Sequence, residues 1–153
     1  MSRLLGKILN RRLRTHLSRR PSSEGGNAIL LATSDNEGWP HIAMLSNWEV
    51  FAGDKTSIRI ATYDSSVTTA NLMRNNRATL VSVDNGATYY VKGMAILLKK
   101  HAKSDANNAI FEMRVRKVLE DKLPGTKITS GITYTKEKGV EPHEELYEEL
   151  KRR

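Results

Sequence analysis

The stretch Ile58–Arg77 restricts the folds open to this chain more than any other segment, because it joins a strand, a turn and a helix within 20 residues. Residues 58–62 alternate in the manner of a strand, and residues 66–75 have the composition of a helix of about three turns. The turn between them is rich in hydroxyls, which belong to Ser65, Ser66, Thr68 and Thr69. Hydroxyls and free backbone N–H groups at the start of a helix suit an anion, usually a phosphate.

The same turn has a simpler interpretation, in which its side chains only begin the helix. Asp64 or Ser65 would then be the N-cap residue, whose side chain accepts a hydrogen bond from a backbone N–H of the first turn. The other hydroxyls would have no ligand. The residues by themselves leave both interpretations open.

The rest of the chain predicts mostly strands joined by short turns. A helix is expected over residues 105–121, and the sequence Asp84-Asn85-Gly86 is a strong signal for a hairpin. The expected strands cover residues 28–33, 41–51, 57–62, 78–83, 88–98 and 127–135. Consecutive strands with short connections pair antiparallel, so the chain is predicted to be mainly β, a six-stranded antiparallel barrel with flanking helices.

The charge of the chain is concentrated at its N-terminus. Residues 1–20 hold seven basic and no acidic side chains, whereas the whole chain has a net charge of +8. Leucines recur in this segment at spacings of three and four, which predicts a basic amphipathic helix over residues 1–20. A flexible linker over 21–27, a barrel domain over 28–135, and a charged C-terminal helix over 136–153 that is part of the same domain would follow.

The basic N-terminal segment has two interpretations. It could contact an anionic membrane or a nucleic acid through its arginines, in which case the barrel would be a non-enzymatic dimeric scaffold. Alternatively, it docks its leucine face on the barrel or on a partner subunit and shows the arginines to water. An arginine-rich segment without acids also resembles an organellar targeting peptide.

The residue types limit the chemistry that the chain can perform unaided. Cysteine is absent, and no two of the four histidines have the spacing of metal ligands on a helix. No serine-nucleophile elbow and no recognisable carboxylate pair is present either. Any chemistry is therefore expected from a bound cofactor. With no apolar run near the ~20 residues that span a bilayer, the expected location is the cytoplasm.

The order of these segments resembles one known family. The strand–turn–strand AILLATSDNEGWPHIAMLSNWEV is followed by a strand ending in Ala61-Thr62, the helix start SVTTANL, the segment NNRATLV, and a strand with VKGMA. This order is similar to that of the pyridoxamine 5′-phosphate oxidase-like family of FMN-binding split β-barrels. The resemblance covers roughly residues 27–135.

The resemblance implies a homodimer with FMN bound non-covalently at the subunit interface. Ala43, Met44, Leu45 and Ser46 would flank the flavin ring on one strand, Ala61 and Thr62 would lie on the adjacent strand, Ser66, Thr68 and Thr69 would contact the phosphate, and Thr88 would approach from the second subunit. The implied reaction is a flavin-dependent oxidation or reduction of an unidentified small molecule.

One departure from the family pattern bears on the activity. Oxidase members carry Arg and Lys directly after the phosphate-turn serine, where this chain has Val67 and Thr68. The oxidase Arg and Lys of the earlier strand correspond to His41 and Ser46. An activity other than vitamin B6 oxidation is therefore expected, and the deazaflavin F420 or haem are alternative cofactors.

Overall fold

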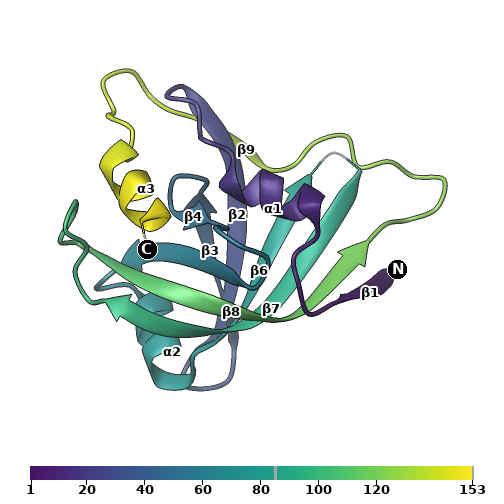
Figure 1. Cartoon of the computed structure of the whole chain (residues 1–153), viewed down its shortest axis with the longest axis horizontal. Coiled ribbons are helices and arrows are strands. Elements are labelled where there is room, and N and C mark those ends of the chain that lie inside the picture. The colour runs from purple at the N-terminus through teal and green to yellow at the C-terminus, as the bar shows by residue number, and fades with distance from the viewer. Residues whose placement is uncertain (85, 153) are drawn as a thin grey trace.

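The computed structural model describes residues 1–84 and 86–152, in which a curled antiparallel sheet carries three helices (Figure 1). The prediction of a mainly β chain with flanking helices is confirmed. The strands are β1 Ser2–Gly6, β2 Gly25–Ser34, β3 Pro40–Ser46, β4 Val50–Phe51, β5 Ser57–Tyr63, β6 Arg77–Asp84, β7 Ala87–Lys99, β8 Asn108–Asp121 and β9 Thr133–Thr135. The helices are α1 Arg11–Ser18, α2 Val67–Asn75 and α3 Glu144–Lys151.

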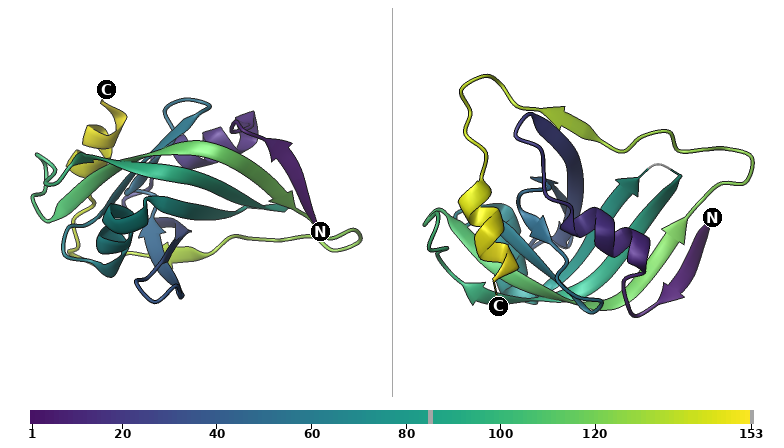
Figure 2. Two further views of the ribbon diagram at one scale, coloured as in Figure 1. Left: turned by 90° about the horizontal axis from the view of Figure 1, so that it is seen from below. Right: turned by 45° about the horizontal axis from the view of Figure 1, so that its top comes forward.

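The strands follow the order β3-β2-β6-β7-β8-β5-β4, while β1 pairs with β8 and β9 with β2. The two end strands of this order, β3 and β4, are joined by the short turn at residues 47–49, so the sheet returns toward its own start. The N–H of Ala61 in β5 donates a hydrogen bond to the carbonyl of Glu49 at 2.8 Å, which extends the β4–β5 pairing by one residue. Figure 2 shows this curl from two further directions. The expected hairpin is formed, since Asp84 pairs with Ala87; its residue Asn85 lies outside the described residues.

The core lies on the inner face of the curl. Leu31, Leu80, Val91 and Val118 lie opposite one another on four neighbouring strands and are fully buried. Helix α1 lies across the open side of the curl (Figures 1 and 2) and buries Leu13 and Leu17 in the same cluster. Burying a leucine side chain contributes about 1.5–3 kcal/mol, so α1 is an integral part of the fold.

An apolar row crosses the opposite, outer face of the sheet. Directly paired residues of antiparallel strands share a face. The pairings connect six strands in this way through Met44, Leu30, Val81, Tyr90, Leu119 and Leu4. Met44 and Leu4 are 63% and 60% exposed, and the other four are partly exposed. We call this set the outer apolar row.

The predicted single helix over residues 1–20 is wrong in its first half. Residues 2–6 form β1, which pairs with the edge of β8 and so satisfies backbone groups that an isolated helix start would leave open. Gly6 ends the strand with φ = +127°, and the side chain of Asn10 then caps α1 by accepting a hydrogen bond from the N–H of Leu13. The leucine spacing predicts one longer helix because the leucines of β1 and those of α1 together happen to recur at intervals of three and four residues.

The predicted helix over residues 105–121 is also wrong, because β8 occupies residues 108–121. Phe111, Met113 and Val115 are buried while Arg114 and Arg116 are exposed, so the side chains alternate as in a strand. Strand β8 pairs with β5 on one side and β7 on the other, and this pairing outweighs its local preference for helix.

The remaining differences are smaller. A turn divides the strand expected over 41–51 into β3 and β4, only residues 133–135 of the strand expected over 127–135 pair in a sheet, and residues 25–27 of the expected linker belong to β2. The described residues therefore contain nine strands where six were predicted.

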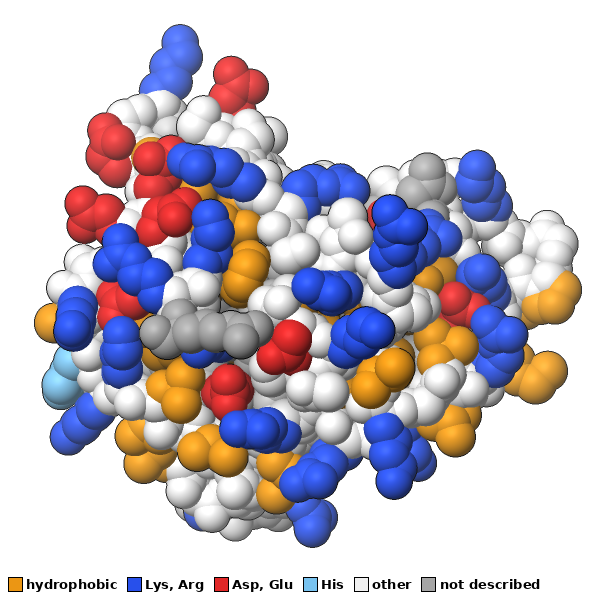
Figure 3. All heavy atoms as spheres, viewed as in Figure 1, with side chains coloured by type: hydrophobic (Ala, Val, Ile, Leu, Met, Phe, Trp, Pro, Cys, Tyr) orange, Lys and Arg blue, Asp and Glu red, His pale blue; other side chains and the backbone are white. Residues whose placement is uncertain are grey.

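Helix α3 is held to the barrel by a buried carboxylate. Glu149 is 5% exposed and accepts hydrogen bonds from the Lys99 ammonium at 2.7 Å and from the Ser104 hydroxyl and N–H at 2.7 and 2.8 Å. These donors outweigh the effect of burial, which by itself would raise the pKa of Glu149, and lower that pKa from 4.5 to about 2. Figure 3 shows acidic side chains gathered at the upper left, where α3 lies, and basic side chains over the rest of that face.

Candidate functional site

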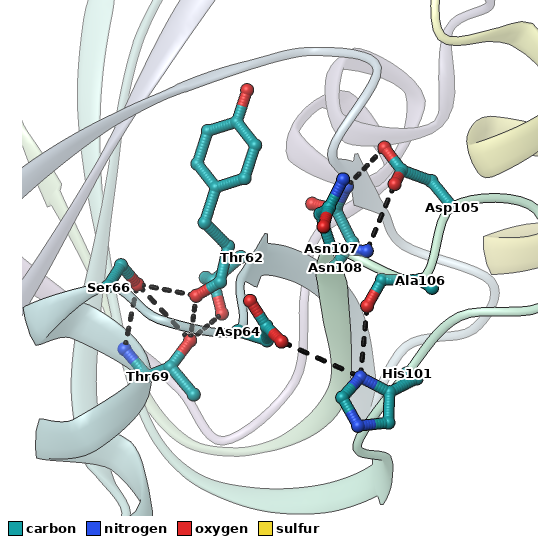
Figure 4. Close-up of polar contacts among 10 residues, drawn as sticks. Thr62, Asp64, Ser66, Thr69, His101, Asp105, Ala106, Asn107 and Asn108 are labelled. Carbon is teal, nitrogen blue, oxygen red and sulfur yellow. Dashed lines mark hydrogen bonds and ion pairs between the residues drawn. The ribbon is translucent and has the colours of Figure 1, made fainter.

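The hydroxyl-rich turn lies where β5 ends and α2 begins (Figure 4). Ser66, rather than Asp64 or Ser65, is the N-cap residue: its hydroxyl oxygen accepts a hydrogen bond from the N–H of Thr69 at 3.1 Å. Its backbone has φ = −78° and ψ = 155°, the extended conformation of a residue that precedes a helix. A hydroxyl of the turn does cap the helix, but the prediction of Asp64 or Ser65 as the N-cap residue is wrong.

The other hydroxyls of the turn form a short internal network. Thr69 Oγ1 donates to the carbonyl of Tyr63 at 2.6 Å, and Ser66 Oγ donates to the same carbonyl at 2.7 Å. Thr62 Oγ1 lies 2.6 Å from Thr69 Oγ1, and since Thr69 uses its proton on Tyr63, Thr62 is the donor of this pair. In this conformation the protons of Thr62, Ser66 and Thr69 are all used within the turn.

Two backbone donors of the helix start stay outside this network. The N–H groups of the N-cap residue and of the next three residues have no acceptor within a helix. Here the N–H of Ser66 donates to Tyr63 and that of Thr69 to Ser66 Oγ, which leaves the N–H groups of Val67 and Thr68. Side by side at the positive end of the helix dipole, they can bind an anion.

A histidine missed by sequence analysis stands beside the turn. His101, in the loop between β7 and β8, has its Nδ1 2.9 Å from the carbonyl of Ala106 and 3.6 Å from a carboxylate oxygen of Asp64 (Figure 4). Both neighbours are hydrogen-bond acceptors, so Nδ1 is the ring nitrogen placed to donate a proton to them. The false helix prediction over 105–121 hid the loop that brings His101 to Asp64.

The four residues expected on β3 divide between the two faces of the sheet. Leu45 is buried in the core, and Ala43 is partly buried against the same core cluster. Met44 points outward as part of the outer apolar row, and Ser46 donates its hydroxyl to the carboxylate of Glu49 at 2.9 Å.

The residues expected on β5 and β7 are placed differently. Ala61 is fully buried beneath α3, next to Thr62 of the turn network, and Thr68 is buried in the first turn of α2. Thr88 is at the start of β7, paired with Val83. Contacts thus connect Ser46 through Glu49 to Ala61, and Thr62 to Thr69 and Ser66. Thr88 lies elsewhere, on the hairpin of β6 and β7.

Glu49 is a second residue that the sequence did not indicate. Burial raises its pKa, although hydrogen bonds from the N–H and hydroxyl of Ser46 oppose that effect. The carboxyl group therefore fixes the turn after β3 while its backbone carbonyl holds β5. Its role is to position the strand that carries Met44 and Ser46.

The described part of the chain contains no group of three or more side chains arranged to hold a metal ion. None of its helices is long and apolar enough to cross a membrane.

Comparison with known proteins identifies the family. The family model for pyridoxamine 5′-phosphate oxidase matches residues 22–124. The chain belongs to this family. It is also 33% identical over 128 residues to the protein YclD of Bacillus subtilis (strain 168), a match that covers 82% of this chain and 83% of YclD.

Solved structures agree with this family at the level of the fold. A candidate pyridoxamine 5′-phosphate oxidase from Lactobacillus delbrueckii superposes with a TM-score of 0.60 at 16% identity, over 77% of this chain and 98% of that protein. An F420 reductase superposes with a TM-score of 0.51 at 16% identity, over 68% of this chain and 94% of the reductase. The split-barrel prediction is thereby confirmed.

Proposed function

We propose that the protein is an FMN-binding oxidoreductase that acts on a small molecule. The observation that carries the proposal is the pair of open N–H groups on Val67 and Thr68, directly after the strand where the family resemblance predicts the cofactor phosphate. The residues fit a phosphate group through these two donors and the helix dipole. The hydroxyls of Ser66 and Thr69 support it by fixing the turn.

This chain would bind and orient the cofactor rather than supply reacting side chains. The open backbone N–H groups would hold the phosphate, while the backbone of Ala43 and Leu45 and the side chain of Met44 would flank the ring. When bound, FMN would supply electron or hydride transfer through the N5 edge of its ring.

The proposal includes a homodimer. Within the described chain the six side chains of the outer apolar row remain partly or largely exposed, and they form a continuous apolar strip across the sheet. Apolar strips of this kind mark interaction surfaces. A second copy on this face would bury the row.

The cofactor test uses one substitution that removes a single backbone donor. Val67 is the first residue of α2, where proline is well tolerated, and the extended backbone of Ser66 suits a residue that precedes proline. We expect Val67→Pro to weaken FMN binding about tenfold to a hundredfold, the effect of one charged hydrogen bond, without lowering the melting temperature. Fluorescence titration with FMN measures this.

Val67→Ala is the matched control, because it keeps the N–H and changes only a side chain that is 52% exposed. Its FMN affinity should equal that of the wild type. Wild-type protein that shows no flavin absorbance after incubation with FMN and desalting, and no titratable binding, contradicts the proposal. Equal affinity in Val67→Pro and Val67→Ala would place the phosphate elsewhere.

A second candidate cofactor is the deazaflavin F420. Two observations favour it: an F420 reductase shares the fold, and Val67 and Thr68 replace the cations of the oxidase turn. Absorbance spectra recorded with FMN, F420 and haem in parallel separate these alternatives. Binding of F420 or haem with no binding of FMN would replace the first proposal.

The N-terminal segment contributes to stability rather than to a membrane or nucleic-acid function in this proposal. The apolar side of α1 is occupied by the barrel core, so it is not available to insert into a lipid bilayer. Two of its arginines also have partners within the chain: Arg12 pairs with Asp84, and Arg14 donates to the carbonyl of Gly53. Vesicle and nucleic-acid binding that disappears when residues 1–20 are deleted would contradict this assignment.

A further inference from the structure

A basic groove lies on the outer face of the sheet, beside the outer apolar row and apart from the hydroxyl-rich turn. Its volume is about 500 Å³, within the usual range for small-molecule sites. Three cations line it, Arg77, Lys92 and Arg116, together with apolar side chains that include Pro40 and Met94. No carboxylate is among its lining residues.

The cations of the groove have no counter-ion within the described chain. Arg77, Lys92 and Arg116 are exposed, and none of them takes part in an ion pair with a residue between 1 and 84 or between 86 and 152. Several basic side chains elsewhere do, such as Arg3 with Glu120 and Lys99 with Glu149. The groove therefore concentrates uncompensated positive charge.

A β-bulge in β8 produces this concentration. The pairing passes from Lys92–Lys117 to Gly93–Val115, so Arg116 is an extra residue without a partner on β7. The alternation of β8 breaks there, and Arg116 and Lys117 are both exposed. Lys92 lies directly opposite Lys117, and like charges in that relation destabilise a sheet.

Gly93 makes the bulge sterically feasible. A Cβ atom at this position would lie 2.4 Å from the carbonyl oxygen of Arg114 and 2.8 Å from Cγ of Met113. Such contacts are too short for any side chain, so the two strands approach this closely only because residue 93 is glycine. The bulge and the cations beside it are thus built into the backbone.

We propose that this groove binds a small organic anion with at least two negative charges, whose apolar portion lies against Pro40 and Met94. Such a ligand offsets the repulsion between the cations and fills a hollow of this size. The groove adjoins the C-terminal end of α2, where Arg74 donates to the carbonyl of Ser34, whereas the hydroxyl-rich turn forms the N-terminal end of the same helix. The proposal is independent of FMN binding.

The test titrates flavin-free, full-length protein by isothermal calorimetry with phenyl phosphate, benzoate and benzyl alcohol. These probes share an aromatic ring and carry about two, one and no negative charges at neutral pH. We expect phenyl phosphate to bind most tightly, benzoate more weakly and benzyl alcohol not at all, and the affinity for phenyl phosphate to fall as salt is added. The absence of phenyl phosphate binding at low salt, or equal binding of benzyl alcohol, overturns the proposal.

Charge-removing variants locate the site. Lys92→Gln and Arg116→Gln should each weaken phenyl phosphate binding by about tenfold or more. Lys100→Gln is the matched control, since Lys100 is exposed in the loop after β7 and does not line the groove. An equal loss of phenyl phosphate affinity in Lys100→Gln would mean that the probe responds only to the general positive charge of the surface. That result would overturn the assignment.

Two further measurements separate this groove from a structural effect and from the cofactor site. In low-salt buffer without ligand, Lys92→Gln should raise the melting temperature, because it removes the repulsion between Lys92 and Lys117. Added phenyl phosphate should raise the melting temperature of the wild type and leave that of the variant unchanged. A lower melting temperature for ligand-free Lys92→Gln contradicts the repulsion argument. FMN affinity should be unchanged in Lys92→Gln; a loss like that expected for Val67→Pro would make the groove part of the cofactor site and overturn its separate role.

Discussion

At the scale of single residues, Glu149 is the side chain whose charge should matter most for stability. Its carboxylate joins α3 to the β7–β8 loop through Lys99 and Ser104. Glu149→Gln keeps the size of the side chain but leaves the Lys99 ammonium without its partner, so we expect the free energy of unfolding at pH 7 to fall by about 2 kcal/mol. Urea denaturation measures this change, and Glu145→Gln, an exposed acid of the same helix, should stay within about 0.5 kcal/mol of the wild type.

The direction of the pKa shift adds a dependence on pH. The folded-state pKa of Glu149 is about 2, below its ordinary value of 4.5. The unfolded state therefore binds the proton more readily, so the stabilisation is complete above pH 4.5 and is lost as the pH falls toward 2. In that window the stability of Glu149→Gln should decline less steeply than that of the wild type. Parallel curves of unfolding free energy against pH for the two proteins would show that the Glu149 carboxylate is not the cause of the loss of stability in acid.

At the scale of elements, the docking of α1 can be measured through one leucine. Leu13 is fully buried between α1 and the barrel, whereas Ile8, just before the helix, is 50% exposed. We expect Leu13→Ala to lower the free energy of unfolding by about 2–5 kcal/mol, because it leaves a cavity in the core. Ile8→Ala should change it by less than about 0.5 kcal/mol. Equal effects in thermal or urea denaturation would mean that α1 is not docked as described.

The same elements show what sequence could and could not predict. Strands β5, β6 and β7 and helix α2 were predicted because their alternation, hairpin signal and hydroxyl-rich start are local features. Strands β1 and β8 were missed because their conformation depends on partners far away in sequence, as in the pairing of Leu4 with Leu119. The candidate site shows the same difference between local and long-range features. The hydroxyl-rich turn was predicted from its residues, whereas the fold was needed to identify Ser66 as the N-cap residue and to bring His101 beside Asp64.

At the scale of the whole molecule, we expect the proposed homodimer to form through the outer face of the sheet. One side of this face is the outer apolar row, and beside it lies the basic groove, with Lys92 two residues along β7 from Tyr90. A self-complementary interface is best formed by the apolar part, because charges that face a second copy of themselves repel. This favours a dimer centred on Val81 and Tyr90, with the groove toward the margin of the contact.

Val81→Glu tests that arrangement. Val81 occupies the middle of the outer apolar row on β6, and a carboxylate there would have to lose water against an apolar partner surface, so we expect the dimer to dissociate. Sedimentation velocity at about micromolar concentration should show twice the mass of one chain for the wild type and a single chain for the variant, each with the circular dichroism of a folded protein. Leu123→Glu introduces the same charge at a residue that is 62% exposed and outside the row, and it should remain dimeric. A monomeric wild type, or a Val81→Glu variant that stays dimeric, would show that the apolar row is not the subunit interface.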